Sequence, residues 1–470
     1  MKTRLSSCIS AAAVAAALLP WICRGADDFR AGAARLDITP PIGTPMAGFY
    51  SMRASLGVID PLYANAIVVE QGGAKAAFVA LDVAYTPRTL VVATRRLITE
   101  QTGITGERVM ISATHTHSGP TLTRDSMMDE ITGGQTPPVV DYMGKLPALI
   151  AKAVASANAK LAPANASVAM GREEHLSFNR RFVMKDGSYS WQGPRLSPNI
   201  ARPAGPIDPD VGVWHLTSAG KKTEPLATYV NFAMHPTVMG GLKFSPDYPA
   251  YLSKRLAEYF GPDMVTFFAN GCCGNINQAN VQWAGQHGGA TEGERVGTVL
   301  GAAVFRALPN LEPQKTFAPR VRSKMVTLQR RAFTDAEIAE ARQTALRLSD
   351  PKISTPAKAK AVCILDTLAK QGVPLEVEVQ AVAISGGFAI VALPGEIFVE
   401  LGLALKKASP FKHTFIAELA NGSIGYIPNR SAYPEGLYEV LSARCTAGSG
   451  ELLVDEAVKM LKEIATPQAN

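Results

Sequence analysis

Two histidines separated by a single residue are the first feature of this chain that could do chemistry. His115 and His117 follow an apolar run and lie in a polar loop, within residues 109–120, that closes on Gly-Pro. Side chains alternate along an extended segment, so both imidazoles are expected to face one small volume. Two neutral imidazoles suit a divalent metal, but both residues can equally be hydrogen-bonded histidines of a core or a rim. The metal interpretation therefore needs further ligands from elsewhere in the chain.

Apolar runs that end in polar loops recur along the chain and indicate strands alternating with helices. Residues 64–70 and 76–84 are typical of a β-hairpin. A helix is expected at 87–101, and a strand at 108–113 then leads to His115. This strand, helix, strand order predicts a right-handed parallel crossover. It would place the two histidines at the carboxyl edge of a sheet, where α/β folds bind their ligands.

The same pattern continues to the end of the chain. Further strands are expected at 226–233, 264–269, 321–329, 376–385, 388–393 and 414–419, and further helices at 139–161, 248–260, 291–308, 334–348, 356–371, 398–407 and 451–464. The sequence thus predicts an α/β fold of mixed, largely parallel sheets with flanking helices and a metal site at the carboxyl ends of the strands. The helices at 334–348 and 356–371 are expected to pair as a surface hairpin. Residues 178–209 have no helical period and indicate a long ordered or functional excursion.

Four of the predicted strand exits carry a potential metal ligand. They are His115, His235, Glu396 and Tyr426. Such exits gather on one edge of a sheet, so these distant positions can converge. Two imidazoles, a carboxylate and a weak oxygen donor suit zinc and leave room for a bound water. Each residue also has a structural interpretation: His235 as a turn cap, Glu396 as a carboxylate favoured by a helix dipole, and Tyr426 as a core aromatic.

Other catalytic chemistries have less support. The sequence contains no G-x-S-x-G elbow, no P-loop and no H-E-x-x-H helix. Adjacent Cys272 and Cys273, between two glycines, could present a thiol nucleophile, but a reactive thiol needs control of its pKa that nothing here supplies. With Cys363 and Cys445 they are the four of six cysteines that lie beyond residue 25, too few for a disulfide framework, and their pairing stays open.

The N-terminal segment and the composition of the chain indicate its localisation and the partners it is expected to have. Residues 1–25 carry early positive charges and a short apolar run, the pattern of a secretory signal peptide, so an exported protein, periplasmic or extracellular, is expected. The mature chain is expected to carry no transmembrane segment, and residues 26–470 are expected to form one catalytic domain. A net charge of +7 over 470 residues, with no basic tract, argues against nucleic acid as a partner. The oligomeric state is left open.

These residues also resemble a known family, the neutral/alkaline, non-lysosomal ceramidases, which are zinc amidases that cleave the amide bond of N-acylsphingosines. Thr-His-Thr-His-Ser-Gly-Pro at 114–120 is similar to that family's signature almost letter for letter. Phe-Ala-Met-His ending at His235, Leu-Pro-Gly-Glu ending at Glu396, and the spacing from Tyr426 to Tyr438 fall in matching order. The resemblance extends over roughly the whole mature chain, so it is specific at the level of the family.

The resemblance implies roles for individual residues. It makes His115, His235, Glu396 and Tyr426 the zinc ligands. His117, Tyr438 and an arginine of the Asn-Arg-Arg segment at 179–181, taken as Arg180 rather than Arg181, would hold the scissile amide.

The chain departs from the family in two ways. It is expected to lack the immunoglobulin-like C-terminal domain that active family members usually carry. A loop serine of the family corresponds here to Asn277. The mechanism would therefore rest on a metal-activated water.

The hypothesis is an exported zinc-dependent amidohydrolase of the neutral ceramidase type that acts on ceramide or a related N-acyl lipid or small-molecule amide. The alternatives are a zinc esterase or phosphoesterase on the same scaffold, and a non-catalytic envelope binding protein in which zinc is a structural staple. The segments at 122–140 and 189–200 are expected to form the rim of the site. Because they are polar and carry only scattered apolar residues, a shorter or more polar acyl amine is expected to be preferred over long-chain ceramide.

Overall fold

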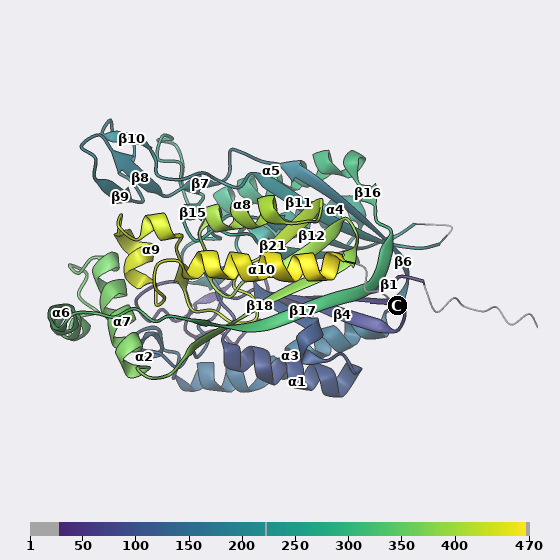
Figure 1. The fold of residues 1–470 in the computed structure, drawn as a ribbon, viewed down its shortest axis with the longest axis horizontal. Coiled ribbons are helices and arrows are strands. Elements are labelled where there is room, and N and C mark those ends of the chain that lie inside the picture. Colours follow the sequence, from purple (N-terminus) through teal and green to yellow (C-terminus); the bar gives the residue numbers. More distant parts are fainter. Residues whose placement is uncertain (1–27, 221–222, 467–470) are drawn as a thin grey trace, which may run out of the picture.

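Two β-sheets pack face to face in the centre of the computed structural model, and helices cover both outer faces (Figure 1). The structure describes residues 28–220 and 223–466. The predicted signal peptide at 1–25 lies outside the described residues. No helix among the described residues is both long and apolar enough to span a membrane.

The larger sheet has nine strands and runs in the order β14-β12-β11-β6-β1-β3-β4-β5, with β16 paired to β6. Its strands are β1 Arg30–Asp37, β3 Tyr63–Gln71, β4 Ala74–Leu81, β5 Val109–Ala113, β6 Ala162–Arg172, β11 Asp210–Ser218, β12 Pro225–Phe232, β14 Val265–Asn270 and β16 Glu312–Pro313. The smaller sheet runs β17-β18-β19-β21, with β17 Thr316–Leu328, β18 Leu375–Ser385, β19 Phe388–Ala392 and β21 His413–Ala417. Two central strands of the larger sheet, β6 and β11, are absent from the sequence prediction.

The prediction of an α/β fold with mixed sheets is confirmed, but the expectation that they are largely parallel is wrong. Most neighbouring strands run antiparallel, as in β1 with β3 and β6 with β11. The parallel pairs include β4 with β5, β12 with β14, and β19 with β21. Short hairpins such as β3 with β4 and longer connections such as that from β6 to β11 join antiparallel neighbours, whereas the parallel pairs β4–β5, β12–β14 and β19–β21 are each joined through a helix. The predicted crossover from β4 through a helix to β5 is of this second kind.

Alternation along the strands divides the apolar side chains between the layers. On β4, Val79 packs toward the helices on the outer face, and Phe78 packs into the space between the sheets. On β18, Ala381 packs outward and Val382 packs inward. This period of two lets each strand contribute to two cores at once.

The outer layers contain most of the predicted helices. Helices α1 Arg88–Thr102 and α3 Pro137–Ala159 cover one half of the larger sheet, and α4 Tyr248–Phe260 and α5 Ala290–Ala307 cover the other half. Helices α8 Val399–Ala408 and α10 Ser449–Ala465 cover the smaller sheet. The layers are therefore helix, sheet, sheet, helix.

Short elements gather at the end of the molecule drawn on the left in Figure 1. They are β7 Phe178–Asn179, β8 Arg181–Met184, β9 Tyr189–Trp191, β10 Ile200–Pro203, α2 Met127–Thr132, α6 Asp335–Ala345, α7 Thr355–Ala369 and α9 Leu437–Ser442. Strands β8, β9 and β10 form a small sheet of their own, so the excursion at 178–209 is ordered. Further short pairs are β2 Gly57–Val58 with β13 Lys243–Phe244, β15 Ile276–Asn277 with β7, and β20 Glu396–Ile397 with β22 Tyr426–Ile427.

The predicted hairpin of α6 and α7 forms, but its placement wholly on the surface is wrong for α7. The side chains of Ala361, Val362 and Ile364 are buried. Helix α7 also packs against α9 and α2, because its apolar face is wide enough to contact more than its partner α6.

Candidate active site

The structure brings the predicted ligands together from strand exits of both sheets. His115 lies two residues beyond β5, and His235 lies three residues beyond β12. Glu396 opens β20 after the chain leaves β19, and it pairs in parallel register with Tyr426 of β22. The strands β5, β12 and β19 each belong to a parallel pair. Parallel pairs deliver their ends to one edge, so the strand-exit argument holds although most of the sheet is antiparallel.

The donor atoms of this cluster lie close to one another. The Nε2 atoms of His115 and His117 are 3.4 Å apart, and the ring nitrogens of His115, His117 and His235 all lie within 4.8 Å. Glu396 Oε2 lies 3.4 Å from His115 Nε2 and 3.2 Å from His235 Nε2. We call His115, His117, His235 and Glu396 the strand-exit cluster.

Backbone carbonyls fix the orientation of two imidazoles. His115 Nδ1 donates to the Ala84 carbonyl at 2.6 Å, and His235 Nδ1 donates to the Cys273 carbonyl at 2.8 Å. A carbonyl only accepts, so in each neutral ring the lone pair is on Nε2, which faces the cluster. His115 also has a φ of 71°, a conformation that costs energy in a residue other than glycine and that is typical of functional sites.

The charges in the cluster are coupled. Burial lowers the pKa of His115, but the Glu396 carboxylate outweighs burial and the pKa is raised. Burial opposes ionisation of Glu396, yet His115 and His235 hold its pKa well below its usual range. Burial, with the charge of Arg180, lowers the pKa of His235 to about 4. An ionised Glu396 beside a neutral His235 is the protonation state that metal binding requires, and a bound cation would have to displace the proton that Glu396 favours on His115.

The donor set fits a zinc ion. At Zn–N distances of 2.0–2.1 Å, two ligands of a tetrahedral ion lie about 3.3 Å apart, and the separations from Glu396 match that value. Each of the two imidazoles has its Nδ1 held by a carbonyl, the arrangement that usually orients a metal-binding histidine. Tyr426 adds a phenol oxygen beside Glu396, and burial raises the pKa of this phenol.

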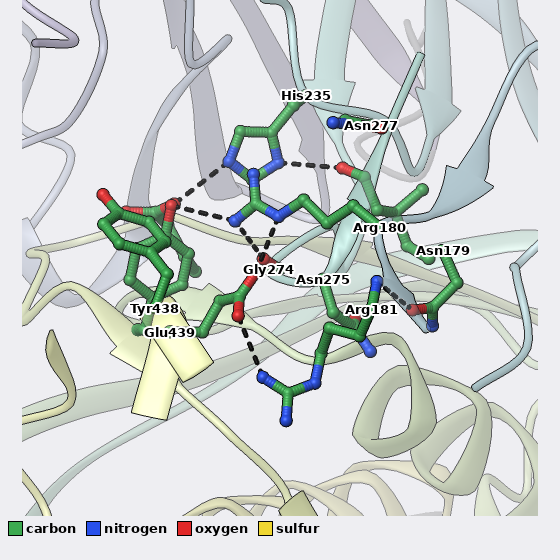
Figure 2. A network of polar contacts seen from close by, with 12 residues as sticks. Asn179, Arg180, Arg181, His235, Gly274, Asn275, Asn277, Tyr438 and Glu439 are labelled. Atoms are coloured by element: carbon green, nitrogen blue, oxygen red, sulfur yellow. Dashed lines mark hydrogen bonds and ion pairs between the residues drawn. The ribbon is translucent and has the colours of Figure 1, made fainter. Parts of the chain in front are cut away.

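Of the two candidate arginines, Arg180 lies against the cluster and Arg181 does not. Arg180 Nη2 donates to Tyr426 Oη at 3.1 Å and to the Gly274 carbonyl at 2.7 Å. Its Nε donates to Glu439 Oε1 at 2.8 Å, as Figure 2 shows. Arg181 bonds the other oxygen of Glu439 and, at the rim, Glu435. One buried carboxylate therefore holds both guanidinium groups and aims one of them at the site.

Aromatic side chains line a cavity on one side of the cluster. His117 and Glu396 form its floor, and its volume is about 760 Å³ including the open mouth. The aromatic residues of this lining are Phe49, Tyr50, Tyr85, Tyr426 and Tyr438. The Tyr438 ring lies 5.3 Å from that of Tyr426, and Trp191 packs against its other face at 4.6 Å. We call this space the aromatic cavity.

Sequence reasoning missed part of the rim. Phe49 and Tyr50 come from the loop at 42–59, which also exposes Ile42, Met52 and Leu56. The loop follows a proline pair and has no strand or helix period, so no pattern pointed to it. The rim is therefore more apolar than the segments at 122–140 and 189–200 alone suggested.

Two further sequence candidates have structural surroundings that argue against catalysis. Cys272 and Cys273 are buried and unpaired, and burial followed by the charge of Glu418 raises the pKa of both thiols well above the usual value. A thiol nucleophile at this position is thus disfavoured. Asn277 accepts a hydrogen bond from the Ala279 amide and lines neither cavity beside the cluster.

Comparison with known proteins agrees with this geometry. Residues 29–244 match the family described as neutral/alkaline non-lysosomal ceramidase, N-terminal. No curated relative matches the chain. The neutral ceramidase from Pseudomonas aeruginosa aligns with a TM-score of 0.73 and 20% identity, over 93% of this chain and 75% of that chain. A structure described as a ceramidase complexed with C2 aligns with a TM-score of 0.73 and 19% identity over the same shares.

At these identities the solved structures establish the likeness of the fold alone. The resemblance seen in the Thr-His-Thr-His-Ser-Gly-Pro segment is confirmed, since that segment lies inside the matched region. Residues 29–244, which are less than half of the chain, are thus similar to the neutral/alkaline non-lysosomal ceramidase family.

Proposed function

We propose that this protein is an exported, zinc-dependent amidohydrolase that cleaves the amide bond of an N-acyl amine. The observation that carries the proposal is the strand-exit cluster, in which imidazole and carboxylate donors lie 3.2–3.4 Å apart beside a buried arginine. The match of residues 29–244 to a family described as ceramidases supports amide hydrolysis. The apolar run at 1–25 supports export.

In this proposal His115, His235, Glu396 and Tyr426 hold the zinc ion. When bound, zinc supplies a Lewis acid and lowers the pKa of water. Tyr426 is the weakest of these donors, and its hydrogen bond from Arg180 favours the oxygen facing the ion. The residues come from both sheets, so we propose that residues 26–470 act as one catalytic unit.

The remaining polar residues act on the substrate amide. Arg180 carries a permanent positive charge, and its guanidinium stabilises the negative charge that develops on the carbonyl oxygen. The Tyr438 hydroxyl orients the amide from the wall of the aromatic cavity. His117 belongs to the cluster without being a proposed ligand, and it accepts or returns a proton at the leaving amine.

The substrate's length is the open part of the proposal. The polar segments at 122–140 and 189–200 favour a short or polar acyl amine, while Phe49 and Tyr50 in the lining of the aromatic cavity would suit a lipid chain. Each buried CH₂ is worth about 0.8 kcal/mol, so kcat/KM measured across N-acyl chain length separates the two.

The experiment that tests the function combines zinc analysis with a substrate panel. We expect about one zinc per chain, as one four-ligand site predicts, and hydrolysis of N-acyl amides in preference to matched esters and phosphoesters. Faster cleavage of the esters or phosphoesters would favour the alternative enzymes. Zinc without any hydrolysis would favour the structural staple.

A further inference from the structure

A second cavity adjoins the strand-exit cluster on the side of His115. It reaches the C-terminal end of α7, where Asp366 and Lys370 line it. The residues that it shares with the aromatic cavity are Ala84, Tyr85, His115, Arg124, Glu396, Gly425 and Arg444. Four cationic side chains line it: Arg124, Arg330, Lys370 and Arg444. Besides Glu396, its lining contains one carboxylate, Asp366. We call this space the cationic cavity.

Of the four cations, Asp366 forms an ion pair with Arg444 alone. Arg444 Nη2 donates to Asp366 Oδ2 at 2.7 Å, and the other oxygen of Asp366 accepts from the Met127 amide. This carboxylate is thus fully engaged in joining α7 to Arg444 and to the start of α2.

The other three cations have no ion pair with any carboxylate among residues 28–220 and 223–466. Arg330 donates its Nε to the Val373 carbonyl, and Lys370 donates to the Asp125 carbonyl. Arg124 stacks over the Tyr85 ring at 4.3 Å, and its buried Nε has no hydrogen-bond partner. Backbone carbonyls and a ring face therefore hold these side chains, and their charges face the cavity uncompensated.

Gathering these charges costs energy that a bound anion would recover. Burial lowers the pKa of Arg330, and the charge of Arg444 lowers it further, so the two guanidinium groups repel each other. Guanidinium groups bind carboxylates and phosphates through paired hydrogen bonds. The partly buried setting strengthens such contacts relative to those on an open surface.

Gly425 lies between the cationic cavity and the strand-exit cluster and contacts residues of both. The Gly425 carbonyl accepts from the Glu396 amide at 3.0 Å. Gly425 has a φ of 82°, and a Cβ at this position would lie 3.0 Å from Arg444 Nη1. Arg444 thus packs directly against the segment that presents Glu396, and the cavity that the four cations line also contains His115 and Glu396 of the cluster.

We propose that the cationic cavity binds an anionic group of the substrate, a carboxylate or a phosphate ester, while the strand-exit cluster cleaves its amide. The inference rests on the proposed amide hydrolysis and narrows its substrate class. The substrate is an N-acyl amide with a negative charge near the scissile bond, whereas ceramide carries none. The aromatic cavity receives the other part of the molecule.

The test compares substrates that differ in charge alone. N-acyl amides of equal length would end in a carboxylate, a phosphate or a neutral methyl ester, and the zinc-loaded protein would be assayed with each. We expect kcat/KM to be at least about tenfold higher for one of the charged forms, since hydrogen bonds to charged groups are worth that much. The charged substrate with the higher kcat/KM, carboxylate or phosphate, identifies the anion that the cationic cavity prefers.

Substitutions in the cationic cavity test whether its residues cause the preference for a charged substrate. Arg330→Gln and Lys370→Gln should each raise KM for the charged substrate about threefold to tenfold, leave its kcat unchanged, and leave the neutral substrate unaffected. Arg342→Gln on α6 and Lys358→Gln on α7 are matched controls, because neither residue lines the cavity. Added NaCl should raise KM for the charged substrate alone.

A binding measurement separates this inference from the proposed function. Glutarate and inorganic phosphate would be titrated calorimetrically into the protein and into both cavity variants. Anion binding that weakens in the variants supports the cationic cavity even if no amide is cleaved, in which case the proposed function fails alone. Equal kcat/KM for charged and neutral amides, with no variant-sensitive anion binding, would overturn the inference and leave the amidase intact.

Discussion

The strand-exit cluster and the elements that cover it are held in place by different means. In the cluster, backbone carbonyls of neighbouring loops fix His115 and His235. In the covering elements α2, α7 and α9, which we call the helical cap, long-range ion pairs such as Arg444–Asp366 and Arg180–Glu439 fix the side chains. Backbone-fixed groups keep their geometry when a neighbour changes. We therefore expect chemistry to depend on the cluster, and substrate choice and stability of the site to depend on the cap.

The largest effect is expected from removing an imidazole of the cluster. His235→Ala should lower the zinc content from about one per chain to near zero and reduce amide hydrolysis by at least about a thousandfold, because no other group replaces the ligand. Elemental analysis and kcat/KM measure the two effects. His215→Ala is the matched control, since His215 is also buried but lies on β11, away from the cluster. Undiminished zinc in His235→Ala would contradict the proposed ligand set.

The next largest effect, on stability, is expected where α9 of the helical cap contacts the residues beside the strand-exit cluster. Glu439 is fully buried and binds both Arg180 and Arg181. Glu439→Gln leaves buried Arg180 without its paired carboxylate and leaves Arg181 with Glu435 alone, which should cost about 3–5 kcal/mol of unfolding free energy. Urea unfolding measures the loss.

The control for Glu439→Gln is Glu435→Gln, because Glu435 is part-exposed and binds Arg181 alone. Its loss should stay below about 1 kcal/mol, as for other exposed ion pairs. Equal losses in the two variants would show that burial of Glu439 is not what holds Arg180 toward Tyr426.

The cluster was more predictable from the sequence than the cap. The strand β5 and the loop that carries His115 give a local signal, an apolar run that breaks into polar residues. Arg124 and Arg444 give none, because each is a single charged residue and only tertiary packing brings them together. The cationic cavity therefore could not be predicted from spacing.

Among the strands, β6 was missed for a related reason. Its sequence, Ala-Pro-Ala-Asn-Ala-Ser-Val-Ala-Met-Gly-Arg, is rich in residues that are weak strand formers. In the structure these small residues sit between two strands and under a helix: a Cβ on Gly171 would lie 3.2 Å from the Ala303 carbonyl of α5. Close packing, not propensity, makes this segment a strand.

A smaller, pH-dependent effect is expected where the cluster's loop meets β4. Burial raises the pKa of Asp82 to about 7, although the Tyr63 amide donates a hydrogen bond to its carboxylate. The folded protein then holds this proton between about pH 4 and 7 while the unfolded chain releases it, so stability falls as the pH rises through that window. Asp82→Asn should remove this loss of stability with rising pH. The loss amounts to about 1.4 kcal/mol for each unit by which the pKa of Asp82 differs between the folded and the unfolded chain.

Unfolding free energies of the two proteins at pH 4.5 and pH 8 measure this contribution, and the variant's advantage should be larger at pH 8. Asp186→Asn is the control, because Asp186 is exposed and lies on a turn. If the difference between wild type and Asp82→Asn shrinks as the pH rises, the carboxylate is stabilised as an ion and the burial argument is wrong.

The smallest effect is expected at α6, which packs against α7 of the helical cap. A variant there tests whether elements beyond the cap influence substrate binding. Thr334 caps α6 by accepting a hydrogen bond from the Glu337 amide, and the Glu337 side chain bonds back to Thr334. Thr334→Ala should lower the unfolding free energy by about 1 kcal/mol, whereas Thr334→Ser should retain most of it. Because α6 contributes no residue to either cavity, kcat/KM should stay unchanged for charged and neutral amides alike. If Thr334→Ala instead raised KM for the charged amide, the α6–α7 pairing would be positioning Lys370, and the cap would act as one unit with the cationic cavity.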